Sequence, residues 1–238
     1  MKKSLLFLAS MLLVVTLSSC GNKAISEKDL NYTMSDDGSG VVILEYTGKT
    51  NAKTLIVPDT IEDLPVVAVQ SLVPFHKGEY ESYNVYGKKS IKKGNINDTV
   101  KRIEFPDTVK KLPVMWNCIA LEYVKLPKSL EPLDDLAAGI NLSGCINLKE
   151  VVIPEGITHV GDLSNTGLKS VTLPSTLKRI CEYAFSNCHN LEEVIIPESI
   201  TSLDFTFEYG DFDCCFEKTN LDLKEQAKIR NLGYKGQF

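Results

Sequence analysis

The chain has 238 residues, of which 43% are hydrophobic and 24% are charged. This balance is typical of a globular protein and excludes a chain that is disordered along most of its length. The net charge of -5 argues against a nucleic-acid partner, because binding to phosphates requires a basic face.

Residues 1–19 have the pattern of a segment that is removed before folding. Two lysines precede an apolar run over residues 5–17, and two serines follow it before Cys20. A secretory signal peptide has this pattern, and the run is too short to span a bilayer as a permanent helix. We therefore expect an exported protein.

The sequence Leu17, Ser18, Ser19, Cys20 resembles the lipobox of bacterial lipoproteins. The resemblance implies cleavage before Cys20, a diacylglycerol on its sulfur, and a lipid anchor in the bacterial cell envelope, at the outer membrane or cell surface. Stable anchoring needs more than one acyl chain, and residues 20–29 are then a flexible tether. The alternative is a plain secreted protein in which Cys20 lies at the cleavage point by chance.

The folded part is expected to begin with a β-hairpin. Residues 30–46 place two extended runs around the sequence DDGSG, which is a hairpin signal. We expect this hairpin to form the N-terminal cap of the repeats that follow.

The body of the chain is an internal repeat. The repeated phrase consists of a short predicted strand, a proline and further apolar residues. Complete copies start at Leu121, Leu148, Leu168 and Leu191, and worn copies start at Lys53 and Val100. Units of this length cannot bury their own apolar face, so they stack, and each unit contacts only its neighbours.

The unit that begins at Leu168 shows the physical meaning of the phrase. Val171 and Leu173 are two residues apart and face one side of a strand, while Thr172 faces the other. Pro174 ends the strand, because proline cannot donate to a β-ladder. We expect strands of successive units to run parallel, about 4.8 Å apart.

This phrase, followed by Ala184, Phe185 and Cys188 in one unit, resembles the BspA-like branch of bacterial leucine-rich repeats. The resemblance covers most of residues 41–216. It implies a mainly β repeat solenoid of the leucine-rich-repeat type over residues 30–218, with parallel stacked strands. Family members are associated with attachment to proteins of host or neighbouring cells.

An insertion at residues 75–98 interrupts the repeat, and insertions in solenoids become loops on one face. It mixes tyrosines, which suit contact surfaces, with the only basic patch of the chain. The candidate partner-binding residues are Tyr80, Tyr83, Tyr86, Lys88, Lys89, Lys92 and Lys93. Such a patch favours an acidic protein or glycan. The alternative is a degenerate repeat whose tyrosines cover the core while its lysines are merely solvated.

A second interruption, residues 203–216, contains five aromatic and four acidic residues. We expect its aromatic side chains to seal the last repeat. If the segment is exposed, it is an interaction site. A calcium site at Asp204, Asp211 and Asp213 lacks the spacing of known calcium loops.

Residues 219–238 are expected to form a C-terminal helical cap. Thr219 or Asn220 is the predicted N-cap, the helical run extends over residues 221–232, and Gly233 is the predicted C-cap. Such a helix covers the exposed end of the last repeat, which solenoids need to remain soluble.

Six cysteines remain besides Cys20. Cys118, Cys145 and Cys188 fall at one repeat position and are expected to form a ladder of buried thiols. Export makes disulfides possible, with Cys118 and Cys145 as the pair that stacking would bring close. The redox state of all six, which include Cys181, Cys214 and Cys215, stays open.

Neither a metal site nor a catalytic site is expected. The group Cys181, Cys188, His189, Cys214 and Cys215 matches no zinc spacing. The three histidines lie in no hydrolase elbow, zinc-protease helix or phosphate loop. We therefore expect a non-catalytic, cofactor-free surface lipoprotein that binds proteins or glycans in adhesion or recognition. The alternative is an accessory envelope lipoprotein that supports a transport or glycan-capture complex.

Overall fold

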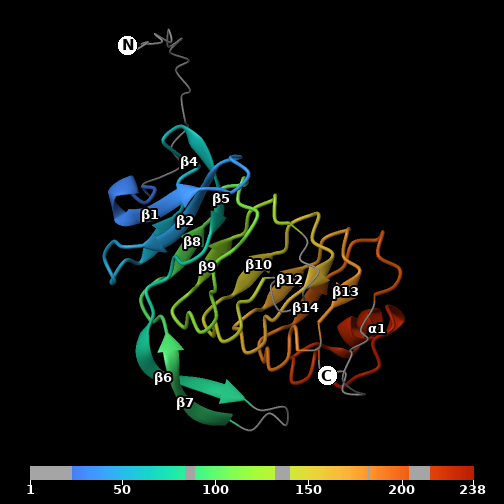
Figure 1. Ribbon diagram of the computed structural model, residues 1–238. Coiled ribbons are helices and arrows are strands. Elements are labelled where there is room, and N and C mark those ends of the chain that lie inside the picture. Colours follow the sequence, from blue (N-terminus) through green and yellow to red (C-terminus); the bar gives the residue numbers. More distant parts are fainter. Residues whose placement is uncertain (1–22, 84–88, 132–139, 182, 204–214) are drawn as a thin grey trace, which may run out of the picture.

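The computed structural model describes residues 23–83, 89–131, 140–181, 183–203 and 215–238. It shows a β-solenoid with a small sheet at one end and a helix at the other (Figure 1). The predicted fold class, a leucine-rich-repeat solenoid with parallel stacked strands, is confirmed. Within the described part of the chain, no helix is long and apolar enough to cross a membrane.

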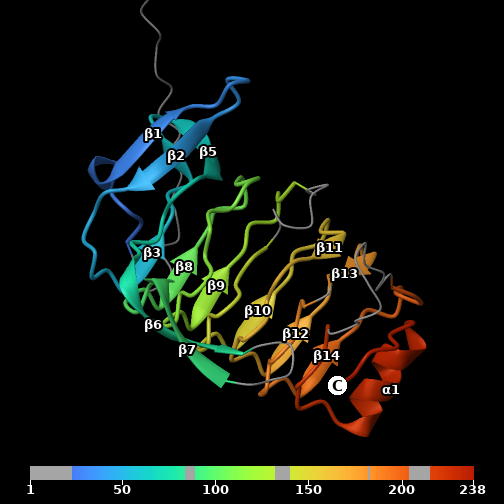
Figure 2. The same ribbon diagram turned by 60° about the horizontal axis from the view of Figure 1, so that its bottom comes forward.

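One strand from each coil forms the row seen in Figure 2. The first ladder pairs three parallel strands: β3 (Thr54–Ile56), β8 (Arg102–Glu104) and β9 (Tyr123–Lys125). The second ladder pairs three more: β10 (Glu150–Val152), β12 (Ser170–Thr172) and β14 (Glu193–Ile195). A further short parallel pair, β11 (His159–Val160) and β13 (Arg179–Ile180), forms another side of the coil.

The repeated aliphatic residues stand in register, as the sequence predicts. Within each ladder, the central residue of each strand pairs with that of the next, and the central residues of all these strands are at most 4% exposed. These residues are Leu55, Ile103, Val124, Val151, Val171 and Val194. The buried side of every strand therefore adds to one apolar interior, which the stack shares.

In successive coils, one residue away from the strand has a left-handed backbone conformation. Asn117, Gly144, Asn165 and Asn187 have φ between 50° and 76°, a region in which glycine and asparagine cost least. Their amides donate to the next coil, as from Asn117 to the Ser143 carbonyl at 2.7 Å. Coils also approach closely at Gly167, where a Cβ would lie 2.4 Å from the Ile146 carbonyl oxygen.

The N-terminal end is closed by a mixed sheet in the order β1-β2-β5-β4. A single turn of 3-10 helix, Glu27–Asp29, precedes it. The antiparallel pair β1 (Leu30–Met34) and β2 (Val41–Tyr46) is the predicted hairpin cap. β5 (Leu64–Val69) pairs in parallel with β2 and antiparallel with β4 (Thr60–Ile61), and its Ala68 bridges to Lys111 of the solenoid.

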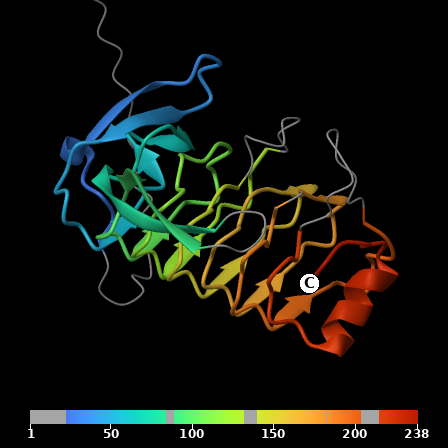
Figure 3. The same cartoon turned by 90° about the horizontal axis from the view of Figure 1, so that it is seen from below.

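The C-terminal end is closed by α1 (Leu223–Asn231), at the far end of the row from the N-terminal sheet (Figure 3). The predicted N-cap is wrong, because the Asp222 carboxylate accepts from the Glu225 amide at 2.8 Å, whereas the Asn220 amide donates to the preceding coil at the Leu191 carbonyl. Glu225 is buried and accepts from the Val194 amide of β14 at 3.4 Å.

Candidate binding surfaces

The insertion forms a two-stranded antiparallel hairpin that hangs outside the coils (Figure 1). Its strands are β6 (His76–Tyr83) and β7 (Lys89–Ile96). An isolated pair of strands is only marginally stable in water, so the attachment at its base matters. There, buried Asn97 donates from Nδ2 to the Pro74 carbonyl at 2.8 Å and accepts at Oδ1 from the Val100 amide at 2.8 Å.

The structure divides the predicted binding residues between the two faces of this hairpin. Tyr80 lies directly across from Lys92, and Glu79 directly across from Lys93; directly opposed residues share a face, and successive residues alternate. Lys93 Nζ lies 3.4 Å from Glu79 Oε1 in an exposed ion pair. The hairpin is therefore not a uniform basic patch.

The structure gives less information on the other candidate binding residues. The backbones of Tyr83 and Lys89 pair with each other at the outer end of the hairpin. Tyr86 and Lys88 lie outside the described residues. The described candidate residues that face one another are thus Tyr80 and Lys92.

The ring of Tyr80 lies over one of two opposed glycines. Gly78 pairs with Gly94 in the middle of the hairpin. A Cβ on Gly94 would lie 3.0 Å from Cε1 of Tyr80, and a Cβ on Gly78 would lie 2.3 Å from Cδ1 of Ile96. The space left by the missing side chains is therefore filled by the tyrosine ring and the isoleucine, as when aromatic residues cover glycines in other sheets.

Tyr80 also lines a notch between the hairpin and the solenoid, which has a volume of about 280 Å³. The other lining residues are Lys77, Asn95, Trp116 and Asn117. Lys77 Nζ donates to Asn95 Oδ1 at 2.8 Å. The tryptophan side chain is 48% exposed. Two aromatic residues from distant parts of the sequence thus line one notch, while the strand register places Lys77 and Asn95 on the hairpin face opposite Tyr80.

Trp116 lies in the worn repeat that starts at Val100, and the coil register shows why it is unusual. The amides that follow Trp116, Ser143 and Ser164 each donate to the next coil at the same position, which makes Trp116 the counterpart of Ser143, Ser164 and Ser186. Ser143 and Ser164 share a hydrogen bond at 3.1 Å. A tryptophan therefore replaces a small polar residue in the coil beside the hairpin.

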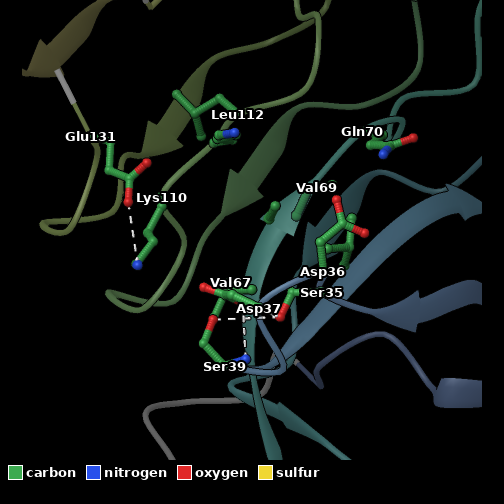
Figure 4. Close-up of a pocket in the computed structure, with 13 residues that line it drawn as sticks. Ser35, Asp36, Asp37, Ser39, Val67, Val69, Gln70, Lys110, Leu112 and Glu131 are labelled. Atoms are coloured by element: carbon green, nitrogen blue, oxygen red, sulfur yellow. Dashed lines mark hydrogen bonds and ion pairs between the residues drawn. The ribbon is translucent and has the colours of Figure 1, made fainter. Parts of the chain in front are cut away.

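A larger hollow of about 650 Å³ lies between the N-terminal cap and the solenoid (Figure 4). The β1–β2 turn contributes Asp37, whose carboxylate accepts from the Ser39 amide at 2.9 Å and the Ser35 hydroxyl at 2.7 Å. These hydrogen bonds, that from the Ser39 amide first, hold the pKa of Asp37 well below its ordinary value. Across the hollow, Lys110 pairs with Glu131 at 3.3 Å. Asp37, Lys110 and Glu131 thus already have partners within the protein.

The exposed face of the strand row is a third candidate surface. Arg102 stacks over the Tyr123 ring at 3.9 Å from its centroid and pairs with Glu104 at 2.6 Å. Farther along the row, Val152 is 67% exposed and Ile195 is 45% exposed. This surface offers apolar contacts between charged ones, but its apolar residues are separated rather than contiguous.

The cysteine ladder is buried among the coils. Cys118, Cys145 and Cys188 are free thiols and fully buried. Cys145 donates to the Met115 carbonyl at 3.2 Å. A hydrogen bond with Cys145, followed by burial, raises the pKa of Cys118 well above its ordinary value. The pair expected to be close is close, without a disulfide, while Cys20 and Cys214 lie outside the described residues.

We expect the thiol of Cys188 to resist alkylation in the folded protein. Burial raises its pKa from 9.0 to about 11, and that of half-buried Cys181 also to about 11. The thiolate is the reactive form. Iodoacetamide followed by peptide mass spectrometry should therefore show slow modification at neutral pH, with Cys181 reacting before Cys188.

The same pKa values fix a pH dependence of stability. The folded-state pKa lies above the unfolded one, so the contribution of each thiol is complete below pH 9.0 and is lost as pH rises toward about 11. The free energy of unfolding in urea, measured as a function of pH, should show this loss. For the alkylation experiment, the control is protein that has been unfolded in urea. Rapid modification of Cys188 at neutral pH would contradict its burial.

Among the described residues, no group of three or more histidines, cysteines and acidic residues could hold a metal ion. Cys215 donates to the Cys181 carbonyl at 3.2 Å, which is a packing role. The proposed calcium ligands Asp204, Asp211 and Asp213 lie outside the described residues. The binding candidates are therefore the hairpin with its notch, the hollow beneath the cap, and the strand face.

Known proteins that are similar to this chain are also leucine-rich repeat proteins. The family described as "BspA type Leucine rich repeat region" matches residues 86–164 and 163–234, with six copies of the repeat. A leucine-rich repeat protein of T. pallidum is similar over 91% of this chain and 99% of its own, with 21% identity and a TM-score of 0.54. One from Bacteroides ovatus is similar over 83% of this chain and 46% of its own, with 20% identity and a TM-score of 0.52. No curated protein sequence matches the chain.

Proposed function

The chain belongs to the BspA-type leucine-rich repeat family, and from this we propose that it is a non-catalytic recognition protein, exported and lipid-anchored in the bacterial cell envelope. It binds a protein or glycan of another surface through the β6–β7 hairpin and the neighbouring coils. Stacked repeats present an extended surface, which suits binding better than catalysis in an enclosed pocket.

The observation that carries this proposal is the hairpin itself. Its exposed residues add nothing to the stacked interior, yet its described part carries Lys77, Tyr80, Lys92 and Lys93 at the surface. Packing explains the buried base at Ile96 and Asn97, but not this outer composition. A contact role explains it, since tyrosine gives a large contact area at low entropic cost and lysines attract acidic groups.

Lipid anchoring rests on the sequence around Cys20. The positive start, the apolar run and the serines before the cysteine fit a lipoprotein signal, and residues 23–26 precede the first element of the fold. We propose that this segment connects the anchor to the solenoid at the cell surface. Protease treatment of intact cells tests exposure. Loss of the protein supports surface recognition, whereas protection would assign it to an accessory role facing the periplasm.

The binding role is tested by capture of partners on cells that display the full chain. Wild-type protein is expected to retain a component of host extracellular or bacterial surface extracts. The double variant Tyr80→Ala, Lys92→Ser should reduce that capture at least tenfold, because it removes the two facing side chains of the hairpin. Bound material is measured by quantitative mass spectrometry.

A matched control is the variant Tyr183→Ala, Lys178→Ser, which changes the same residue types at exposed positions of a coil nearer the C-terminal end. Its capture should equal that of the wild type, and circular dichroism melting should show that both double variants remain folded. Equal capture by wild type and the hairpin variant would remove the hairpin from the function.

A further inference from the structure

The hairpin of β6 and β7 is a small sheet with open edges. Among the described residues, its two strands form a sheet only with each other. A long free edge can pair with a strand of another chain, so proteins usually protect such edges. A two-stranded hairpin is also only marginally stable by itself. A third strand would therefore complete this sheet.

The outer edge of β7, the side away from β6, begins at the contact between the hairpin and the solenoid. Asn97 directly follows β7. Its amide donates to the Asn117 carbonyl at 3.1 Å, and its carbonyl accepts from the Ala120 amide at 3.4 Å. Both groups thus point to the neighbouring coil and away from β6. Because backbone groups alternate in direction along a strand, those of Ile91 and Lys93 point to the same outer side.

Past Asn97, the described part of the chain places no strand beside this edge. The notch that Asn95 and Trp116 line together lies where the coil departs from β7. Farther along the strand, the side chain of Ile91 is 58% exposed. The outer edge of β7 therefore combines free backbone groups with an exposed apolar side chain.

The charges of β7 select the kind of strand that can pair with it. The strand carries Lys89, Lys92 and Lys93 and no acidic residue. Alternation places the side chain of Lys92 on one face of the hairpin and those of Ile91 and Lys93 on the other. An added strand thus meets an ammonium group on each face. Opposite charges directly across two strands stabilise a sheet, whereas like charges destabilise it.

We infer that the outer edge of β7 binds an extended acidic segment of a partner protein as a third strand of the hairpin. This inference rests on the proposed function and names the class of partner. Main-chain hydrogen bonds to Ile91 and Lys93 hold the segment, and its acidic side chains lie across from Lys92 and Lys93. The same lysines disfavour pairing between the β7 strands of two copies, because two basic edges repel each other.

The probe is a synthetic peptide of the length of β7, eight residues, in which glutamate alternates with valine. Its binding to the full-length protein is followed by fluorescence anisotropy of a dye on the peptide. The Kd should be on the order of 100 µM, because a single short strand forms a small interface. A peptide with lysine in place of glutamate should bind at least tenfold more weakly, and added salt should weaken the acidic peptide by screening the exposed charges.

Methylation of the peptide nitrogens separates strand addition from attraction by charge alone. In an added strand, every second amide points to β7 and the others point away. One peptide is therefore N-methylated at all glutamates, and another at all valines. Only one of the two should lose binding, by at least tenfold. Equal effects in both would show that the peptide is not held as a strand and would overturn the inference.

The variant Ile91→Pro tests the edge from the side of the protein. Proline removes the outward amide of residue 91, leaves the amides that face β6, and is tolerated in edge strands. Binding of the acidic peptide should fall at least tenfold. The matched control Ile91→Thr keeps the amide and a β-branched side chain, so its Kd should stay within about threefold of the wild type. Hydrogen exchange of the Lys92 amide, which faces β6, should be the same in all three proteins if the hairpin is intact.

The outcomes distinguish this inference from the broader function. Absence of binding by the acidic peptide, or binding that Ile91→Pro does not change, overturns the strand site. If extracts are nevertheless captured by wild-type cells and not by the hairpin variant, the recognition function stands with another mode of contact. If no extract is captured while the acidic peptide binds as described, the strand site stands and the proposed function fails.

Discussion

Replacing Phe216 with alanine is expected to lower the free energy of unfolding by about 3–5 kcal/mol, the range observed for large aromatic residues in cores. Phe216 is fully buried. Its ring stacks on Phe185 with the centroids 5.3 Å apart, and meets the edge of Tyr234 at 5.3 Å. The variant loses the buried area of the ring and its ring contacts, including a third with Phe238 at 6.0 Å, and such contacts add roughly 0.5–1.5 kcal/mol per pair.

The loss of stability should be greatest at the C-terminal end of the solenoid. Phe216 and Phe185 occupy neighbouring coils, and Tyr234 follows α1, so the substitution weakens the cap and the last two coils together. Units of a solenoid contact only their neighbours. In urea, the circular dichroism signal of the Phe216→Ala variant should therefore begin to change before the fluorescence of Trp116, which reports on a coil near the other end.

Val152→Ala provides the control for this experiment. Val152 is aliphatic but 67% exposed on β10, and surface changes of this kind usually alter stability by no more than about 0.5 kcal/mol. An equal effect of the two substitutions would show that the ring cluster does not hold the C-terminal cap in place.

Replacing Cys20 with serine is expected to transfer the protein from the membrane fraction to the soluble fraction. Serine offers no thiol for the diacylglycerol, and binding to a bilayer falls by about 0.8 kcal/mol for each methylene that is no longer buried. Two long acyl chains thus account for essentially all of the attachment. The measurement is fractionation of cells expressing the full chain, with incorporation of labelled palmitate as the chemical readout.

Cys181→Ser is the matched control, since Cys181 lies within the folded coils with half-buried side chain. It should leave both fractionation and palmitate incorporation as in the wild type. Wild-type protein that is recovered without palmitate from the medium would instead identify a plain secreted protein and would refute the anchor.

The stacked core could be predicted from the sequence because it depends on short-range periodicity. Val171 and Leu173 alternate with Thr172 along one strand, and the same alternation recurs in each unit, so the in-register column that includes Val151, Val171 and Val194 follows from the repeat alone. The break between the ladders at β9 and β10 was not predicted. It falls between Pro127 and Pro154, a longer spacing of strand-ending prolines than in the unit on either side.

The notch could not be predicted in the same way. Tyr80 and Trp116 are far apart in the sequence and lie in an insertion and in a worn repeat, where no periodicity assigns a face. Their meeting depends on how Asn97 fixes the hairpin base to the solenoid. The available signal was Trp116 itself, a tryptophan aligned with the serines of three following units. The helix start was misplaced for a similar reason, because the Asn220 amide is used by the Leu191 carbonyl.

Glu225 has a consequence for how this molecule behaves beside its own copies. The last strand of a parallel row is an edge strand, whose unpaired amides can hydrogen-bond to a strand of another chain. When such pairing repeats head to tail, it gives open-ended filaments. At β14 the Val194 amide is occupied by the Glu225 carboxylate, and α1 follows beside it (Figure 2). The terminal helix thereby protects against polymerisation, which matters most where many copies of the chain are concentrated together.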